Sequence, residues 1–580
     1  MTIDEERPKP AKGLSNLGNT CFYNSTMQCL MHTHSLYDWQ TKVTEERQLI
    51  IKKGTVVVNE KKVEVPDAVI TLKENTSLPL VSALQHFLAE FRVGRNPNPS
   101  PLFQQIAVKA PRFRGWAQQD AHELLRYLLD GIRTEELKRY KDAIFTYLGV
   151  EDKPTPEQII MCKALIDSTD RCYIDSIFGG SLLQIISCSK CKHMSNSLEP
   201  FLDLSLPLNY GAPSTPTVPT FFPPNNRREG TPSKHKVKKL KKKERREAKK
   251  AAKANKTATT VENGNTENGN GEMQSPPTAS TDELNPTTTA AIGTTDDIKA
   301  IDDNSSTDDD SSNEDMSVSD NENSNPADDA MENGNLSSSS PNYVAVLSPP
   351  PPEDDHTEER TVLNSLKHFT APESLCASNA YECENCCAPY NKQLPANSKD
   401  KMTVEATKRY LIYSPPCVLT VHLKRFEQVA MTTFGNRMRT RKIRGHVEFP
   451  FVLDISPFCS QNGQRINKGQ NEVIYSLYGL VSHSGDLGGG HYVAYVKSRN
   501  NVESLKQFME AGMKPDRLCQ TMEELNNGIT VTQSVNKEEI LQKLDENATW
   551  YYASDSHVRT INISEVKNAE AYILFYERIF

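Results

Sequence analysis

GLSNLGNTCFYNS, the stretch Gly13–Ser25, is a polar, glycine-bearing loop that runs into a helical pattern beginning near Cys21. At the start of a helix, the backbone N–H groups and the helix dipole stabilise a thiolate, and the same N–H groups can receive an oxyanion. Cys21 is therefore a candidate nucleophile. The other reading of a free cysteine is a small buried hydrophobe, which fits Cys29, Cys162 and Cys172 here.

A reactive thiol needs an imidazole that takes up its proton and later gives it to the leaving group. This base usually comes from a distant part of the chain. His491 is our candidate, because it follows three glycines and opens a strand pattern, which leaves room for a substrate. His483 lies across the same glycine loop and is the nearest competitor. Three other histidines fall in or beside a low-complexity region: His235, His356 and His368.

Helical patterns dominate the first half of the chain and strand patterns the second. In Asp120–Ile132 the leucines fall on one helical stripe, and Asp120 and Glu123 are placed to cap the helix start. Four later segments are rich in Val, Ile, Leu and Tyr: Val418–Phe426, Val473–His483, His491–Lys497 and Ala571–Tyr576. Ser484–Gly490 is predicted to be the loop between the middle two. Helices followed by strands predict an α+β fold.

The 580-residue chain has a long segment, Pro223–Asn342, without any Phe, Tyr or Trp. Such a segment cannot bury enough apolar surface to offset the entropy of ordering it, so we predict a disordered insertion. Within it, Lys234–Lys256 is basic and Asp296–Asp329 is acidic. We divide the chain into an N-terminal tail (1–11), a first globular part (12–210), the insertion (211–342) and a second globular part (343–580), which contains a partly helical insertion of its own (501–547).

Composition limits the setting in which the chain works. Its net charge is −8, and no apolar run approaches the roughly 18 residues that a membrane helix needs. Thirteen cysteines, several in Cys-x-x-Cys pairs, favour metal binding or catalysis over disulfides, so we expect an intracellular chain and no membrane partner. The basic run Lys238–Arg246 fits a nuclear import signal, a nucleic-acid contact or a solvated tract. We favour import, expect no nucleic-acid partner, and place the chain in the nucleus or cytoplasm.

Two Cys-x-x-Cys pairs, CSKC (Cys188–Cys191) and CENC (Cys383–Cys386), have the spacing that lets four thiolates bind one tetrahedral Zn²⁺. The insertion lies between them but can loop out, because the entropy of loop closure grows slowly with length. Four reduced structural cysteines are the alternative, and Cys376 and Cys387 are possible substitute ligands.

Six blocks, in order along the chain, resemble those of the ubiquitin-specific proteases. GLSNLGNTCFYNSTMQCL (Gly13–Leu30) resembles the Cys box, and YGLVSHSGDLGGGHYVAYVK (Tyr478–Lys497) resembles the His box. The other four are QQDAHEL (Gln118–Leu124), VLTVHLKRF (Val418–Phe426), WYY (Trp550–Tyr552) and AYILFY (Ala571–Tyr576). The resemblance covers about Ala11–Tyr210 and Tyr343–Phe580, and six ordered blocks are very specific.

The resemblance implies a papain-like architecture, with a helical thumb that carries Cys21, a β-rich palm that carries His491, and fingers that grip ubiquitin and hold zinc at their tips. The activity it implies is hydrolysis of the bond after the C-terminal glycine of ubiquitin, through a thioester acyl-enzyme. Ubiquitin and ubiquitinated proteins are then the partners. We expect no catalytic cofactor and a monomeric enzyme.

By the same resemblance, Asn16 supplies an oxyanion-hole amide. Carboxylates suit the arginines of a basic tail, although Asp120 and Glu123 can equally cap a helix, and the two readings do not exclude each other. The channel that the resemblance implies for the glycine-ended tail of ubiquitin is lined by Gln118, Asp120, Glu123, Gly489, Gly490 and Tyr492.

The sequence departs from the family at the third member of the triad, which is usually Asp or Asn. In WYYASDSHV (Trp550–Val558) the aligned residue is Ser554, followed by Asp555. Neighbouring side chains of an extended segment point to opposite faces, so only one of the two can face His491. We favour Ser554, as in a minority branch of the family. The rival hypothesis that this serine raises is an inactive ubiquitin-binding scaffold.

Overall fold

The computed structural model describes residues 8–42, 47–58, 61–72, 77–115, 117–150, 152–208, 359–395, 398, 400–430, 438–461, 463–466, 469–486, 489–500, 505–514 and 536–580. The predicted insertion 211–342 and its basic run lie outside these residues, as does the middle of the predicted segment 501–547. Every described element belongs to one unit made of Met1–Pro213 and Asn342–Phe580.

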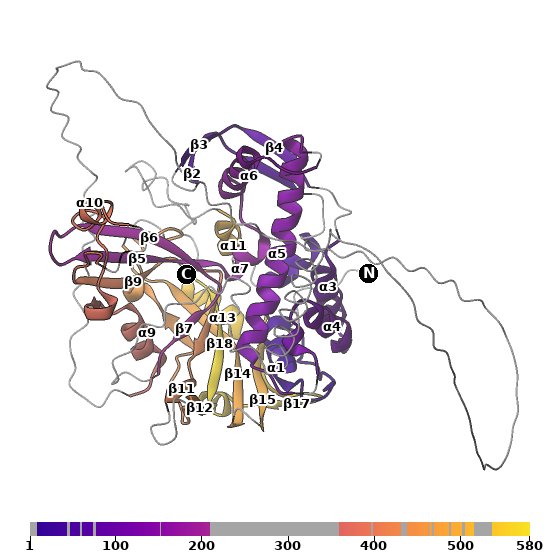
Figure 1. Cartoon of the computed structure of the whole chain (residues 1–580). Coiled ribbons are helices and arrows are strands. Elements are labelled where there is room, and N and C mark those ends of the chain that lie inside the picture. Colours follow the sequence, from indigo (N-terminus) through magenta and orange to yellow (C-terminus); the bar gives the residue numbers. More distant parts are fainter. Residues whose placement is uncertain are drawn as a thin grey trace, which may run out of the picture. The chain divides into compact units, whose positions relative to one another are not determined.

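The helices of the first globular part pack around α5. They are α1 (Cys21–Met31), α2 (Ser35–Lys42), α3 (Pro79–Arg92), α4 (Pro99–Lys109), α5 (Ala121–Tyr147), α6 (Pro156–Ser168), α7 (Tyr173–Phe178) and a short 3₁₀ turn, η1 (Pro111–Phe113). Figure 1 shows α5 as the longest helix, running beside α3 and α4. The predicted helix start is confirmed, because the Asp120 side chain accepts hydrogen bonds from the backbone N–H groups of His122 and Glu123.

The larger sheet of the described chain has eight strands in the order β17-β16-β15-β14-β18-β10-β7, with β13 paired to β14. Its strands are β7 (Leu204–Leu206), β10 (Val418–Leu423), β13 (Val452–Asp454), β14 (Ile474–Asp486), β15 (Gly489–Ser498), β16 (Thr549–Ser554), β17 (His557–Ile561) and β18 (Ala571–Arg578). The pairs are antiparallel except for β10 with β7. Because sequence-distant strands meet here, the sheet joins both globular parts of the chain.

A second sheet, β6-β5-β9-β8, lies apart from the helices around α5 in Figure 1. It contains β5 (Gly180–Cys188), β6 (Met194–Phe201), β8 (Glu373–Leu375) and β9 (Ala406–Ser414). Near it lie α9 (Val362–Thr370), η2 (Ala377–Asn379) and α10 (Ala388–Asn391). The remaining elements are η3 (Ser456–Phe458), α11 (Lys506–Gly512), α13 (Lys537–Asp545) and α14 (Ile563–Lys567).

The α+β prediction is confirmed, but three details differ from the expected elements. The first half also contains short strands, which pair as β1 (Gln48–Ile51) with β4 (Ala68–Thr71), and as β2 (Gly54–Val58) with β3 (Lys61–Val65). The predicted strand Val418–Phe426 is split into β10 and β11, and β11 (Phe426–Ala430) pairs with β12 (Met438–Lys442).

The chain leaves the large sheet at Arg425, a buried residue whose guanidinium donates to the backbone carbonyls of Ala571, Ile443 and Gly445. A buried arginine needs such acceptors, and meeting them interrupts the strand. The loop predicted at Ser484–Gly490 is also shorter than expected, because β14 continues to Asp486 and β15 begins at Gly489.

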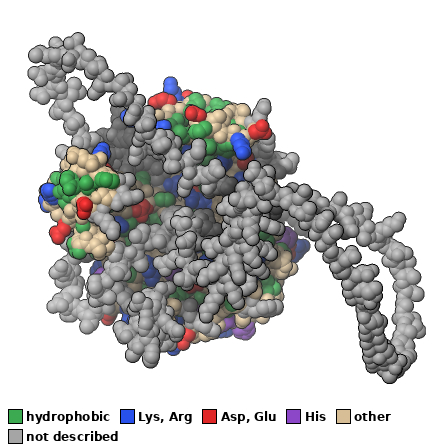
Figure 2. Space-filling view, in the orientation of Figure 1, with side chains coloured by type: hydrophobic (Ala, Val, Ile, Leu, Met, Phe, Trp, Pro, Cys, Tyr) green, Lys and Arg blue, Asp and Glu red, His purple; other side chains and the backbone are tan. Residues whose placement is uncertain are grey.

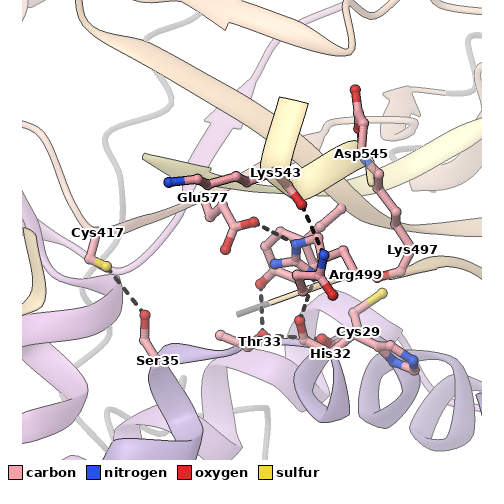
Figure 3. A network of polar contacts seen from close by, with 12 residues as sticks. Cys29, His32, Thr33, Ser35, Cys417, Lys497, Arg499, Lys543, Asp545 and Glu577 are labelled. Atoms are coloured by element: carbon pink, nitrogen blue, oxygen red, sulfur yellow. Dashed lines mark hydrogen bonds and ion pairs between the residues drawn. The ribbon is translucent and has the colours of Figure 1, made fainter. Parts of the chain in front are cut away.

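Helix α1 is buried along its whole length, with α5 on one side and strands β14, β15 and β16 on the other. Gly479 in β14 permits this approach, because a Cβ there would lie 3.2 Å from Cys29 Sγ. At the C-terminal end of α1, Arg499 Nη1 donates to the carbonyl of His32 at 2.9 Å. Figure 3 shows Arg499 between this carbonyl and Glu577, with which it forms a buried ion pair at 2.5 Å. The helix is therefore fixed to the sheet at its far end.

No helix among the described residues combines the length and the apolar character needed to cross a bilayer.

Candidate active site

The loop before α1 is closed by its own side chains. Asn16 Oδ1 accepts hydrogen bonds from the backbone N–H groups of Gly18 at 2.9 Å and Thr20 at 3.1 Å, and Thr20 Oγ1 accepts one from Leu17 N at 2.8 Å. Helix α1 then begins at Cys21, whose residue is 3% exposed. The predicted position of Cys21 at a helix start is confirmed.

Asp555 binds this loop to the large sheet. It lies in the turn between β16 and β17, and its carboxylate accepts hydrogen bonds from Asn16 Nδ2 at 2.9 Å and Asn24 Nδ2 at 2.7 Å. Its backbone carbonyl accepts a third from Leu14 N at 2.9 Å. Gly13 lies so close to the same turn that a Cβ there would be 2.4 Å from the Ser556 carbonyl oxygen. The carboxylate of Asp555 therefore serves the cysteine loop.

Ser554, by contrast, contacts His491. Its Oγ lies 2.8 Å from His491 Nε2, and the imidazole is half-buried. The pairing of β15 with β16 explains this contact, because Ala494 faces Ala553 and the alternation puts His491 and Ser554 on the same face of the sheet. Of the two side chains left open by the sequence, the serine touches the ring.

His483 lies on the other face of the same strands. It pairs with Tyr492 across β14 and β15, and the two rings are 4.3 Å apart between centroids. Burial, together with the charge of Lys442, lowers the pKa of His483 to about 4. His483 is therefore a neutral packing residue, and it explains one glycine, because a Cβ on Gly490 would lie 2.3 Å from its Nε2.

Gln118 joins the cysteine to the strand that carries His491. Its Nε2 lies 3.3 Å from Cys21 Sγ and 2.7 Å from the carbonyl oxygen of Gly490, and its Oε1 accepts a hydrogen bond from Gly490 N at 3.0 Å. One side chain therefore contacts both the thiol and the residue that precedes His491. Cys21 and Gly490 come from distant parts of the chain.

The two carboxylates at the start of α5 differ. Asp120 caps the helix through Oδ1 and accepts a hydrogen bond from Tyr572 through Oδ2 at 2.5 Å. Glu123 is exposed and forms an ion pair with Arg112 at 2.6 Å. The capping interpretation therefore applies to the side chain of Asp120, whereas the Glu123 side chain faces solvent.

Two other predicted channel residues have contrasting surroundings. Tyr492 is buried, only 3% exposed, and packs between the rings of His483 and Tyr572. Gly489 is exposed, and a Cβ at this position would meet nothing within 4 Å.

A buried cluster beside Asp120 was not predicted from the sequence. His122 and His422 stack with ring centroids 3.7 Å apart, and His122 Nε2 lies 2.9 Å from Asp203 Oδ2. Burial lowers the pKa of His422. Burial also acts to raise the pKa of Asp203, but its interactions with His122 and Arg126 outweigh burial and hold this pKa below its usual range. The two histidines occur in the blocks QQDAHEL and VLTVHLKRF, but nothing in the sequence pairs them with Asp203.

This cluster is poorly arranged for a metal, although the three residues have potential ligand atoms within 4.8 Å of one another. The two imidazole planes are only 10° from parallel. Imidazole lone pairs lie in the ring plane, so two stacked parallel rings cannot both direct them at one ion. The cluster is better described as a polar contact between α5 and the large sheet.

The four cysteines of the two Cys-x-x-Cys pairs do come together. Cys188 Sγ lies 3.7 Å from Cys386 Sγ, Cys191 Sγ lies 3.6 Å from Cys383 Sγ, and all four ligand atoms are within 4.8 Å of one another. In a tetrahedral site with Zn–S bonds of about 2.3 Å, neighbouring sulfurs are about 3.8 Å apart. The geometry therefore fits one tetrahedral ion.

Neither substitute ligand belongs to this group of four. Cys387 Sγ lies 4.0 Å from Cys386 Sγ, and Cys376 is exposed.

Near this end of the second sheet, the large exposed apolar residues are Met194 and Tyr390. In Figure 2, hydrophobic side chains gather on the described surface over β6 and α10, the elements to which these two residues belong.

Comparisons with known proteins cover nearly the whole chain. The family model described as ubiquitin carboxyl-terminal hydrolase matches residues 12–576. Ubiquitin carboxyl-terminal hydrolase 16 of Danio rerio is 30% identical over 650 residues, which cover 98% of this chain and 74% of that protein. Ubiquitin carboxyl-terminal hydrolase 45 of Danio rerio is 29% identical over 656 residues, covering 98% of this chain and 76% of the relative.

Among solved structures, the SAGA Ubp8/Sgf11/Sus1/Sgf73 DUB module bound to ubiquitin aldehyde matches with a TM-score of 0.45 and 17% identity, covering 100% of this chain and 71% of that one. The residues matched by the family model include the loop before α1, strand β15 with His491, and most of β18. Because the family model and the two Danio rerio relatives match nearly the whole chain, the chain belongs to the ubiquitin carboxyl-terminal hydrolase family and is a cysteine-type deubiquitinase.

Proposed function

We propose that Cys21, His491 and Ser554 form the triad with which this deubiquitinase cleaves the bond after the C-terminal glycine of ubiquitin. The observation that carries the proposal is the 2.8 Å contact of His491 Nε2 with Ser554 Oγ. The contacts of Gln118 with Cys21 Sγ and with Gly490 support it, because they place the thiol beside the strand residue next to His491.

Ser554 would fix the tautomer of His491. When Ser554 Oγ accepts a hydrogen bond from Nε2–H, Nδ1 carries the lone pair that takes the proton from Cys21 Sγ. The thiolate attacks the carbonyl carbon, the C–N bond breaks, and the imidazolium gives its proton to the departing amine. Water then hydrolyses the thioester, with neutral His491 as its base. A hydroxyl stabilises imidazolium less than a carboxylate does, but a thiolate needs less help than an alkoxide.

Asn16 and backbone N–H groups at the start of α1 would hold the oxyanion. One N–H of the Asn16 amide is bonded to Asp555, and an amide has a second N–H to donate. Asn16 is exposed, so a substrate carbonyl can reach it. In this proposal Asp555 is a positioning residue, because it acts on the reaction through Asn16 and Asn24.

The tail of ubiquitin would lie between α5 and β15. Glu123 is the carboxylate best placed to meet a basic side chain of the tail, because it is exposed and such a side chain can replace its present partner, Arg112. Asp120 already has both oxygens engaged and would act by charge. Gln118, Gly489 and Gly490 would border the passage, and buried Tyr492 would support it from behind.

The four-cysteine cluster would hold a structural Zn²⁺, for which its thiol donors and sulfur spacing are suited. The ion would fix the end of the second sheet, where segments from both globular parts meet.

An electrophilic ubiquitin probe tests the proposed nucleophile. We expect wild-type protein to be labelled, Cys21→Ala to lose all labelling, and Cys29→Ala, a buried cysteine of the same helix, to keep it. Labelling that persists in Cys21→Ala would mean that another thiol reacts. Binding of ubiquitin by the wild type without any labelling or cleavage would favour the inactive scaffold.

A further inference from the structure

The edge of β15 next to the thiol is only partly covered. Along one edge, β15 pairs with β14 as far as Gly489, but along the other it pairs with β16 only from Ala494 onward. Within the described residues, the stretch between these two positions has no strand on the second edge. Open strand edges are where extended peptides add by backbone hydrogen bonding.

Gln118 occupies this edge with its side chain. Its Oε1 accepts from Gly490 N at 3.0 Å and its Nε2 donates to Gly490 O at 2.7 Å. This exchange of one N–H···O bond in each direction is the pattern of two facing residues in an antiparallel ladder. The side-chain amide therefore takes the place that a backbone amide of an added strand would take.

The same amide covers the thiol. Nε2 has two hydrogens, and besides Gly490 O it lies 3.3 Å from Cys21 Sγ. Cys21 is only 3% exposed, and Gln118 is one of the side chains that contact its sulfur. Gln118 itself is half-buried and follows exposed residues, Gly115 and Ala117, so it can move at less cost than the buried helix α1.

From these contacts we infer that Gln118 is a placeholder for the substrate: its amide fills the peptide-binding edge at Gly490 and shields Cys21, and the extended Gly-Gly tail displaces it. This inference rests on the proposed role of Cys21. It assigns Gln118 a function in the free enzyme, because the residue keeps small electrophiles from the thiol until a strand-forming tail competes for Gly490. If Gln118 were only an oxyanion donor, loss of its amide would not speed alkylation of Cys21, because that substitution at a saturated carbon develops no oxyanion.

The first readout is the rate at which iodoacetamide alkylates Cys21, followed by mass spectrometry from pH 5 to 10. The plateau at high pH reports access to the thiolate independently of the fraction ionised. We expect Gln118→Ala to raise the plateau rate about threefold to tenfold, the equivalent of one or more lost hydrogen bonds. Gln118→Met, which keeps the length of the side chain without its amide, should do the same. The matched control Gln119→Ala should remain within about twofold of wild type.

The second readout is hydrogen exchange at the amide of Gly490. In the free enzyme, both Gln118 variants should exchange this hydrogen faster than wild type and Gln119→Ala, because its acceptor is lost. In the presence of ubiquitin, all four proteins should protect it equally, because the tail supplies the acceptor.

Unchanged or slower alkylation in both Gln118 variants would overturn the placeholder, as would protection of Gly490 by ubiquitin in wild type alone. Failure of the ubiquitin probe to label Cys21 is a separate outcome, which would refute the proposed function and leave the alkylation readout interpretable.

Discussion

Ser554 is the last residue of β16 and Asp555 opens the following turn, and their side chains contact different partners. Ser554 contacts His491 Nε2, whereas Asp555 turns towards the cysteine loop and binds the amides of Asn16 and Asn24. Asp555 adopts the left-handed backbone conformation, with φ of 51°, which lets the hairpin turn directly after the serine. The side chain in contact with the ring is therefore the neutral hydroxyl, and the neighbouring carboxylate is bound to the cysteine loop.

Replacing Ser554 tests its contact with the ring. Ser554→Ala should lower kcat about tenfold with little change in KM, because one hydrogen bond that orients the imidazole is lost while the binding surface is kept. Ser554→Asn, which restores an acceptor, should recover most of the activity. Steady-state hydrolysis of a fluorogenic ubiquitin amide measures both. Wild-type kcat in Ser554→Ala would show that the contact does not orient the base.

Replacing Asp555 tests the positioning of the loop. Asp555→Ala removes the acceptor of two amides, so we expect kcat to fall about tenfold to a hundredfold. Asp555→Asn keeps one acceptor oxygen, so its kcat should lie between those of the wild type and Asp555→Ala. A structural role without effect on the loop would lower the melting temperature equally in both variants and leave kcat of the folded fraction unchanged, which is the contradicting result.

At the scale of the elements, α1 is fixed at both ends to strands of the large sheet. Its start is bound through Asn16 and Asn24 to Asp555, and its last turn is capped by Arg499, which Glu577 holds in place. A cation at the C-terminus of a helix also complements its dipole. These contacts at both ends hold helix α1, which carries Cys21, in place against the large sheet, which carries His491 on β15.

The ion pair at the far end of α1 is expected to matter for stability. Arg499→Met should cost about 3–5 kcal/mol of unfolding free energy, because Glu577 is left buried and unpaired. Adding Glu577→Gln should recover part of this loss, because the buried charge is removed. Urea unfolding of the single and double variants measures the coupling, and equal stability of wild type and Arg499→Met would contradict this account of α1.

Elements with strong local signals were predicted from the sequence, and those that depend on distant contacts were not. The starts of α1 and α5 follow from the helical pattern, supported at α5 by a capping aspartate, and both were found. The break between β10 and β11 was not, because it depends on carbonyls that Arg425 meets far along the chain. Ser554 was favoured over Asp555 from the aligned block, and the register of β16 against β15 accounts for its contact with His491.

At the scale of the whole molecule, the described residues before and after the segment 209–358 share one large sheet and one cysteine cluster. Strand β7 from the first part pairs with β10 from the second, and Cys188 meets Cys386. The sequence spacing suggested the cluster, and the pairing of β5 with β9, together with the bridge between Tyr381 and Val404, brings its two halves together. The His122–Asp203–His422 contact gives α5 a further link to the large sheet.

Zinc content tests the link at the cysteine cluster. We expect wild-type protein to contain about one zinc per chain, and Cys383→Ser to lose it and to melt at lower temperature, because structural zinc contributes directly to folding. Cys376→Ser, at an exposed cysteine outside the four, is the control and should keep its zinc. Elemental analysis of the purified variants measures this, and full zinc content in Cys383→Ser would refute the site.

The proposed mechanism requires a thiol from the start of the chain to meet an imidazole from its second half. A crystal structure of the covalent adduct with an electrophilic ubiquitin tests it most directly. We expect the adduct on Cys21 Sγ, His491 Nδ1 within hydrogen-bonding reach of the linked atoms, and Ser554 Oγ still in contact with His491 Nε2. An adduct on another cysteine, or a His491 ring turned away from the linked sulfur, would contradict it.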